Sequence, residues 1–209
     1  MRRVRPSSVR QRFEGHIAGV GSGSGVRVVV GHWASTPMGA FSDVMVETPA
    51  GHRVLLAPRP DVAAFIEGTY EFDEVRIEPV AVSEAGSEWH VGTPSLTLSL
   101  TTGRSTVLGH LLRRLPARLL TSPVWCTVVD PVARTLLRGV RTRGTARTGR
   151  REYYGATDVR RVVGATGSFD GADLGPLRPV DPPCRFGFSS TPRQPSVTTV
   201  VTTVTGGAA

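Results

Sequence analysis

PMGAFSDVMVETPAGHRVLLA (residues 37–57) is the stretch of sequence that decides the fold class. Residues 41–48 and 52–57 are two short runs that contain several apolar residues, including Val, Met and Leu. Short runs of this kind bounded by turn residues are typical of β-strands, and the Thr-Pro-Ala-Gly sequence over 48–51 is rich in turn residues. The stretch therefore predicts a pair of strands joined by a short turn.

The residues on either side of this pair predict more strands than helices. A glycine-serine run over 19–25 leads into the β-branched residues 28–30, whereas a phosphate-binding glycine loop leads into a helix, so we interpret it as a flexible hairpin connection. Asp61 is the expected N-cap of a short helix that ends near Gly68. Further strands are expected at 12–18, 26–33, 72–82, 88–91 and 96–100.

The pattern changes after Arg104. Apolar residues recur at helical spacing over 107–115, and Ser122-Pro123 and Asp130-Pro131 each place Pro directly after a cap residue, as at a helix start. A helical insert is therefore expected over about 105–138. The sequence predicts a tight turn at Asp170-Gly171 and further strands at 140–147, 158–169, 185–188 and 196–205.

The chain has 209 residues and contains 25 arginines but no lysine. This excludes covalent catalysis through a lysine Schiff base and a P-loop lysine. Asn is also absent and Ile occurs three times, a combination that codon usage in a GC-rich genome explains. The net charge of +8 is therefore weak evidence for a nucleic-acid partner.

A single domain over 1–209 is expected, with a flexible basic leader at 1–11 and a flexible tail at 206–209. The leader lacks the apolar run of a secretory signal, and no uncharged stretch approaches the roughly 18 residues of a membrane span. The sequence therefore predicts a soluble cytoplasmic protein without a membrane partner. Cys126 and Cys184 are interpreted as ordinary buried thiols.

Residues 37–46 resemble the G-P-Y-x-E-plus-apolar strand of the acetoacetate decarboxylase superfamily, with Phe41 in place of Tyr and Asp43 in place of Glu. The hairpin, short helix and strand that follow keep the family's order, and 159–188 resembles its closing strands. The resemblance implies a mainly β (α+β) fold: a closed, cone-like antiparallel β-barrel with a few external helices.

The sequence departs from the family where its catalytic lysine belongs. A W-G-x-P-K-K-like run is expected there, but residues 68–75 read GTYEFDEV, with acids in place of lysines. A carboxylate forms no imine with a ketone, so the family's Schiff-base chemistry does not follow from the resemblance. What remains is a barrel that binds a small apolar, carboxylic or oxo-acid molecule, with or without catalysis by another route.

Asp43 is the candidate catalytic residue. On an alternating strand it lies on the same side as Phe41 and Met45, and an acid among apolar groups has a raised pKa and can serve as a general acid or base. The alternative is a carboxylate at the barrel rim that is solvated or paired with Arg. Arg27 and Arg76 are candidate ligands for an acidic group, or else form surface salt bridges.

Metal binding and cofactors are not expected. Glu14 with His16 and Glu88 with His90 share strand faces, but two ligands make no metal site. His52, beside the predicted turn, is either a proton shuttle or an ordinary exposed histidine. No nucleophile motif is present.

Two other functions compete with small-molecule binding. Residues 134–161 contain nine Arg against two acids, and Tyr153 and Tyr154 lie beside Arg150 and Arg151, a composition that suits phosphate contacts and base stacking. A solvated protein rim explains the same charges. The third hypothesis is a structural homo-oligomer without a ligand.

Overall fold

The computed structural model describes residues 10–136, 140–145 and 149–206. Its strands are β1 (Arg10–Ser22), β2 (Arg27–Ser35), β3 (Phe41–Glu47), β4 (Arg53–Ala57), β5 (Glu74–Ile77), β6 (Ala81–Ala85), β7 (Glu88–Gly92), β8 (Leu96–Ser105), β9 (Arg143–Thr145), β10 (Arg151–Phe169), β11 (Ala172–Asp173), β12 (Leu177–Arg178) and β13 (Ser196–Thr205). Its helices are α1 (Pro60–Glu67), α2 (Val107–Leu112), α3 (Ala117–Leu120) and α4 (Pro123–Leu136).

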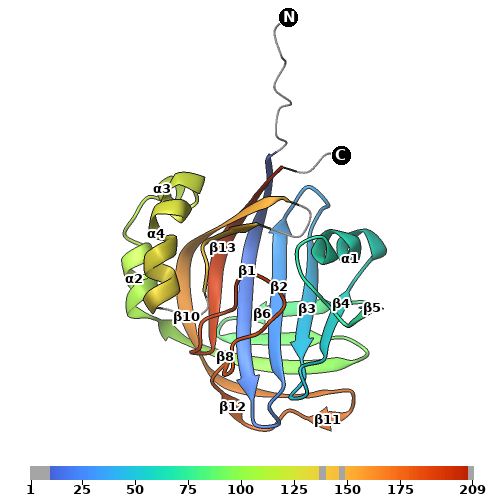
Figure 1. Cartoon of the computed structure of the whole chain (residues 1–209). Coiled ribbons are helices and arrows are strands. Elements are labelled where there is room, and N and C mark those ends of the chain that lie inside the picture. The colour runs from blue at the N-terminus through green and yellow to red at the C-terminus, as the bar shows by residue number, and fades with distance from the viewer. Residues whose placement is uncertain (1–9, 137–139, 146–148, 207–209) are drawn as a thin grey trace, which may run out of the picture.

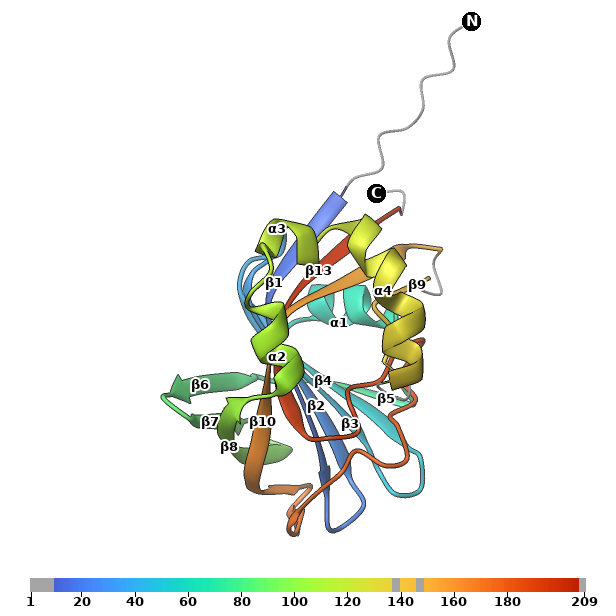
Figure 2. The same cartoon turned by 90° about the vertical axis from the view of Figure 1, so that its left-hand side faces the viewer.

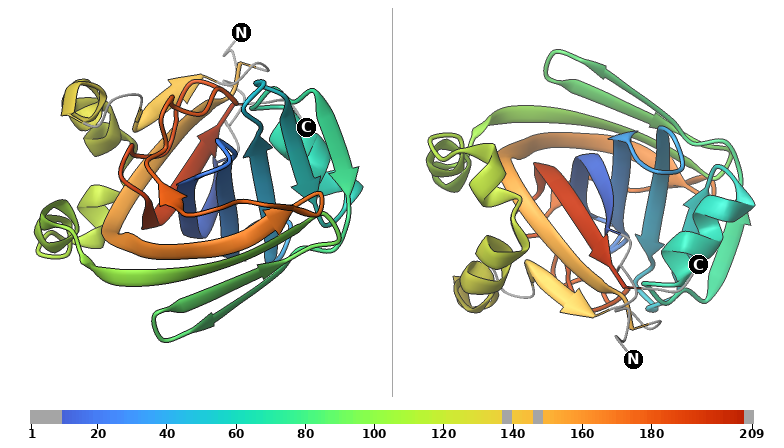
Figure 3. Two further views of the ribbon diagram at one scale, coloured as in Figure 1. Left: turned by 90° about the horizontal axis from the view of Figure 1, so that it is seen from below. Right: turned by 90° about the horizontal axis from the view of Figure 1, so that it is seen from above.

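One curled sheet contains these strands, in the order β5-β4-β3-β2-β1-β13-β10-β8-β7-β6 (Figures 1 and 3). Neighbours along this order are antiparallel except β4 and β5, which are parallel. The predicted mainly β class with a few external helices is confirmed. The expected closure is incomplete, because β5 and β6 end the order without pairing with each other.

Side chains bridge part of this open seam. The Arg76 guanidinium on β5 donates to Ser95 Oγ at 3.0 Å, and Ser95 Oγ donates to Glu78 at 2.8 Å. Ser95 lies just before β8, so these bonds connect the β4–β5 end of the sheet to the β7–β8 end. The curl is therefore held by polar side chains where backbone pairing stops.

The main core lies between the two ends of the curled sheet. Side chains two residues apart on a strand point to the same face, and these faces form the core. Val44 and Val46 of β3 and Leu98 and Leu100 of β8 belong to it, and each is almost fully buried. Complete burial of such a side chain contributes about 1.5–3 kcal/mol. The opposite face of β3 is therefore left to form a second, separate interior.

The strand pair predicted from 37–57 is confirmed. Val44 pairs with Leu56 across β3 and β4, and the backbone N–H of Thr48 donates to the carbonyl of His52. Gly51 closes the turn with a φ of 85°, a conformation that residues with a side chain rarely adopt.

The N-terminal prediction needs two corrections. β1 begins at Arg10, so residues 10 and 11 belong to the sheet, whereas 1–9 of the expected flexible leader and 207–209 of the tail lie outside the described residues. β1 also continues to Ser22, so much of the glycine-serine run is strand. Pairing with β2 and β12 on its two sides accounts for this extension.

Two further strand predictions are wrong. The strand predicted over 72–82 is split into β5 and β6, and Pro79, which lacks a backbone N–H, lies between them. Residues 185–188 form no strand. That stretch belongs to a connection containing Pro182, Pro183 and Pro192, whose missing backbone donors disfavour sheet pairing.

The helix starts are partly as predicted. Ser122 Oγ accepts a hydrogen bond from the backbone N–H of Trp125, as expected for the start of α4. Asp61 is not the N-cap of α1: Arg59 occupies that position and Pro60 is the first helical residue. Asp130-Pro131 starts no helix, because Pro131 lies inside α4.

The expected helical stretch corresponds to α2, α3 and α4, which lie on one side of the sheet (Figure 2). Their outer side chains include six exposed apolar residues, Val107, Leu111, Leu119, Val124, Val128 and Val132. Within the described ranges, none of the helices has both the length and the apolar character that a membrane span requires.

Candidate functional site

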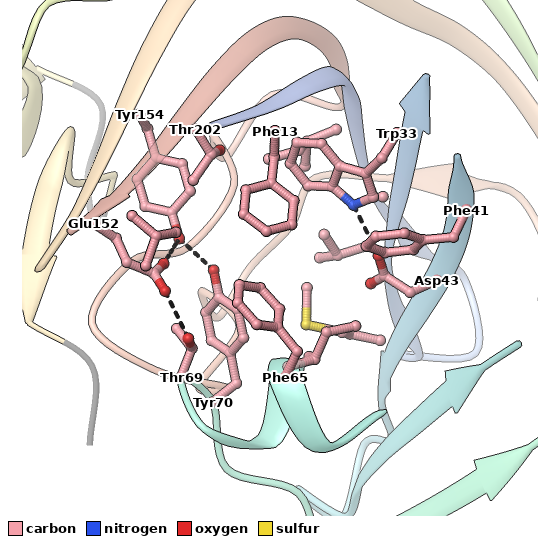
Figure 4. A pocket seen from close by; sticks show the side chains of 16 residues that line it. Phe13, Trp33, Phe41, Asp43, Phe65, Thr69, Tyr70, Glu152, Tyr154 and Thr202 are labelled. Carbon is pink, nitrogen blue, oxygen red and sulfur yellow. Dashed lines mark hydrogen bonds between the residues drawn. The ribbon is translucent and has the colours of Figure 1, made fainter. Parts of the chain in front are cut away.

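The second interior contains a cavity of about 60 Å³. It is enclosed by α1 and by the ends of β1, β2, β3, β10 and β13 (Figure 4). Its walls are mainly aromatic and aliphatic, with two carboxyl groups among them. The lining residues are Phe13, Ile17, Val29, Gly31, Trp33, Phe41, Asp43, Met45, Phe65, Ile66, Thr69, Tyr70, Glu152, Tyr154, Thr202 and Val204.

Strand β3 supplies one wall of the cavity. Phe41, Asp43 and Met45 all line it, which follows from the two-residue period of the strand. Phe13 from β1 stacks on Phe65 from α1, with ring centroids 4.9 Å apart, and forms part of the aromatic lining. Phe41, Asp43 and Met45, which the sequence placed on one side of a strand, therefore lie together on one wall of the cavity, and their role in binding stays a prediction.

The Asp43 carboxyl group is buried in this wall. Only 3% of the residue is exposed, and its Oδ1 accepts a hydrogen bond of 3.0 Å from Trp33 Nε1. Gly31 lies directly opposite on β2, where a Cβ would stand 2.4 Å from Oδ1 and 2.6 Å from the indole nitrogen. Glycine is therefore required at this position for the indole to reach the carboxyl group.

Burial raises the pKa of Asp43 to about 7, and the hydrogen bond from Trp33 opposes this increase. Both protonation states are therefore populated near neutral pH. A carboxyl group of this kind can donate or accept a proton in a reaction, because general acid–base catalysis is most efficient when the pKa lies near the working pH.

Glu152 is the second carboxyl group and lies across the cavity from Asp43 (Figure 4). Its Oε1 accepts a hydrogen bond of 2.6 Å from Thr69 Oγ1, and its Oε2 accepts one of 2.8 Å from the Tyr154 hydroxyl. The Tyr154 and Tyr70 hydroxyls are hydrogen-bonded to each other. Burial raises the pKa of Glu152, and burial together with the nearby Glu152 raises those of both tyrosines.

Local structure positions these four residues. Glu152 and Tyr154 are two residues apart on β10 and point to the same side. Thr69 and Tyr70 follow α1, and their backbone N–H groups both donate to the carbonyl of Ile66 at 2.9 Å. This wall was not predicted from the sequence, because Glu152 and Tyr154 lie in the arginine-rich segment and the strand that carries them was expected to begin only at residue 158.

Arg27 and Arg76, the two arginines expected to bind an acidic ligand, do not line the cavity. Arg27 is 4% exposed and pairs with Glu47 at 3.0 Å. Arg76 pairs with Glu74 at 2.7 Å and Asp170 at 2.6 Å. The pairs of Arg76 correspond to the surface salt-bridge alternative, whereas Arg27 forms a buried ion pair with Glu47.

The other candidate residues also lie outside the cavity. His52 contacts Glu74 at 3.1 Å on the surface. Both cysteines are free and buried, and burial raises the pKa of Cys126 to about 11 and that of Cys184 to about 12, so neither is an activated thiol. Over the described ranges, no three side chains of the types that bind metals converge as a group.

The arginine-rich segment 134–161 is partly engaged within the protein. Arg141 forms an ion pair of 2.9 Å with Asp130, and the Arg150 guanidinium lies 4.7 Å from the centroid of the Phe65 ring. Tyr154 points into the cavity and is not available to stack on a base. Residues 138 and 147 lie outside the described residues. Nucleic-acid binding by this segment stays a prediction.

Fold and site together define a mainly β protein with a curled sheet and an aromatic-walled internal cavity. No protein-family model matches the sequence, and no curated protein matches it. Among solved structures, the chain is similar to the crystal structure of acetoacetate decarboxylase from Legionella pneumophila. The alignment covers 98% of this chain and 89% of that chain, with a TM-score of 0.44 and 7% sequence identity.

Proposed function

We propose that the protein binds a small, largely apolar molecule in the cavity and that Asp43 is the ionisable group that contacts its polar end. The observation that carries the proposal is a buried carboxyl group with a pKa of about 7 on an otherwise apolar wall. Enclosed apolar sites with a few polar groups are typical of small-ligand binding. Perturbed carboxyl groups in such sites are frequently functional.

The volume of the cavity limits the size of the ligand. At about 60 Å³ it is smaller than a cavity of roughly 150 Å³ that accommodates benzene in another protein. A molecule of a few non-hydrogen atoms therefore fits. A second cleft of about 340 Å³, lined by residues that include Arg185, Phe186 and Phe188, lies beside the cavity and shares Thr69 with it.

The chemistry available to the site is proton transfer. Asp43 can accept a proton from a bound C–H or O–H acid and return it, and the chain has no lysine for an imine. The Tyr70 and Tyr154 hydroxyls face the same space, but Tyr154 donates its hydrogen to Glu152 and Tyr70 donates its own to Tyr154, so toward a ligand they can act only as acceptors. Any catalysis therefore follows a route different from the Schiff-base route of the family that residues 37–46 resemble.

A fragment screen by ligand-observed NMR tests this proposal. Small apolar compounds are expected to bind the wild type and to change the fluorescence of Trp33, and Asp43→Asn is expected to weaken binding of those with a polar group. Asp61→Asn is the matched control, because it removes one acid from the exposed start of α1. Equal binding to all three proteins excludes a role for Asp43, and absence of binding to the wild type rejects the site.

A specific observation also favours the homo-oligomer hypothesis. Val124, Val128 and Val132 lie along one side of α4 and are 73%, 66% and 55% exposed, whereas Cys126 and Asp130 are buried on the other side. A surface helix usually turns its apolar side inward, whereas this row of α4 faces outward. Exposed apolar groups of this kind mark interaction surfaces.

We propose that α4 pairs with α4 of a second copy. The four-residue spacing makes the valine row self-complementary: around a two-fold axis at Val128, Val124 of one copy faces Val132 of the other. Light scattering after size exclusion is expected to give a dimer mass for the wild type and a monomer mass for Val128→Asp. Val163→Asp, at another exposed apolar position, is the control. A monomeric wild type overturns the proposal.

A further inference from the structure

Resting on the proposed function of the cavity, we infer that its ligand is a small aliphatic amine, bound as the ammonium ion against Asp43. An amine takes the place of the carboxylic or oxo-acid ligand that the sequence suggested. Three features of the cavity favour an amine: the charges on its walls, the acceptor atom that remains available, and the aromatic rings around that atom.

The charges on the walls favour a cation. Asp43 and Glu152 both line the cavity, whereas no Arg or His is among the described lining residues. Arg27 and Arg76, which could have received an acidic ligand, pair with carboxylates elsewhere. A carboxylate ligand would thus meet two acids and no compensating cation, which is costly in a buried site.

One carboxylate oxygen remains available for the ligand. Both oxygens of Glu152 already accept hydrogen bonds from protein hydroxyls. Asp43 Oδ1 is engaged by Trp33, and in the described part of the chain no group donates to Oδ2, which points into the cavity (Figure 4). A primary ammonium group, which carries three donors and no acceptor, is complementary to such an oxygen.

The aromatic lining suits the same ligand. Trp33 and Phe41 flank Asp43, and Phe13, Phe65 and Tyr70 complete the surrounding wall (Figure 4). The faces of aromatic rings attract cations, and aromatic cages are a recurrent way of binding ammonium groups. The alkyl part of the ligand then contacts Met45 and the aliphatic residues of β1, β2 and β13.

The protonation of Asp43 gives the inference a distinct pH dependence. The titratable groups that share the cavity with it are Tyr70, Glu152 and Tyr154, and both tyrosines stay neutral because their pKa values are raised. An alkylamine remains protonated up to about pH 10. Amine affinity is therefore expected to rise about tenfold per pH unit up to about pH 7 and to level off above it.

Calorimetric titration with ethylamine, ethanol and acetate, which suit a cavity of about 60 Å³, tests the inference. We expect ethylamine to bind the wild type at least tenfold more tightly than ethanol at about pH 8, and acetate not to bind. Asp43→Asn is expected to abolish this preference, whereas Asp61→Asn, an exposed change of equal charge, retains it.

A second variant keeps the test informative if Asp43→Asn does not fold. Trp33→Phe leaves the acid in place but removes the hydrogen bond to Oδ1, so the pH at which amine affinity levels off is expected to move upward. An unchanged pH profile in this variant contradicts the assignment to Asp43. Binding of ethanol or acetate as tightly as ethylamine overturns the amine inference alone, and binding of none of the three counts against the proposed function as well.

Discussion

Asp43 and Glu152 are both 3% exposed and line the same cavity, yet their surroundings differ. Both oxygens of Glu152 accept hydrogen bonds from side-chain hydroxyls, and one of these hydroxyls is bonded to a further tyrosine. Asp43 has one donor, the Trp33 indole. The protein therefore satisfies the carboxyl group of Glu152 with its own hydrogen bonds, whereas the carboxyl group of Asp43 can still accept a hydrogen bond from a ligand.

The two environments have different energetic consequences. A fully satisfied buried network holds its elements in a defined arrangement, and here it connects β10 to the segment after α1. A partly satisfied buried carboxyl group lowers stability whenever it is ionised. Such a group is retained most readily where it serves a function, which is why we assign the binding role to Asp43 rather than to Glu152.

The pH dependence of stability is expected to show the largest effect. The pKa of Asp43 is about 7 in the folded protein against an ordinary value of 3.8, so the unfolded chain ionises first as the pH rises. Stability contributed by neutral Asp43 is complete below about pH 4 and is lost as the pH rises through about 7. The pKa difference corresponds to a loss of about 4 kcal/mol.

Denaturant unfolding of the wild type and Asp43→Asn over this pH range measures that loss. The raised pKa of Glu152 acts in the same direction in both proteins, so the difference between the two curves isolates Asp43. We expect Asn to be increasingly stabilising toward high pH. Parallel curves would show that Asp43 is not a buried titrating group.

Glu152→Ala is expected to cost about 3 kcal/mol in the free energy of unfolding. It leaves Thr69 Oγ1 and the Tyr154 hydroxyl without their buried acceptor. At about pH 7, Asp43→Ala is expected to cost less, because only Trp33 loses a partner. Urea denaturation of both variants measures the contrast, and a larger cost for Asp43→Ala would reverse the assignment of roles.

Gly31→Ala is expected to destabilise the protein by about 2 kcal/mol, since its methyl group would overlap with Asp43 Oδ1 and the Trp33 nitrogen. The steric conflict lies in the Asp43 wall alone. Binding of the small ligand should therefore weaken more than in Tyr154→Phe. Titration of the two folded variants with ethylamine checks this order, and equal affinities would argue against a precise Trp33–Asp43 geometry.

Tyr154→Phe is expected to have the smallest effect, about 1.5 kcal/mol, because it removes the hydroxyl's hydrogen bonds to Glu152 and Tyr70 while Thr69 still satisfies the other Glu152 oxygen. Thermal unfolding measures the change. Glu152→Ala combined with Tyr154→Phe should cost little more than Glu152→Ala alone, since the two residues belong to one network. Additive costs would indicate that they act independently.

Predictions from the sequence succeeded where a local pattern determined the structure. The two-residue period of the strand expected over 41–48 placed Phe41, Asp43 and Met45 on one face, and that face lines the cavity. They failed where a local signal was outweighed by packing. Asp130-Pro131 looked like a helix start, but α4 continues through it, and Asp130 accepts hydrogen bonds from Arg141 and the backbone of Thr142.

The sequence by itself determined the mainly β class, the face of β3 that carries Asp43, and the impossibility of lysine chemistry. These depend on side-chain period and residue type, which are local. Only the tertiary structure decided that Glu152 meets Thr69, 83 positions away, and that Arg27 and Arg76 face other acids instead of the cavity. Contacts between distant strands depend on how the sheet curls, and alternation within a single strand does not encode that curvature.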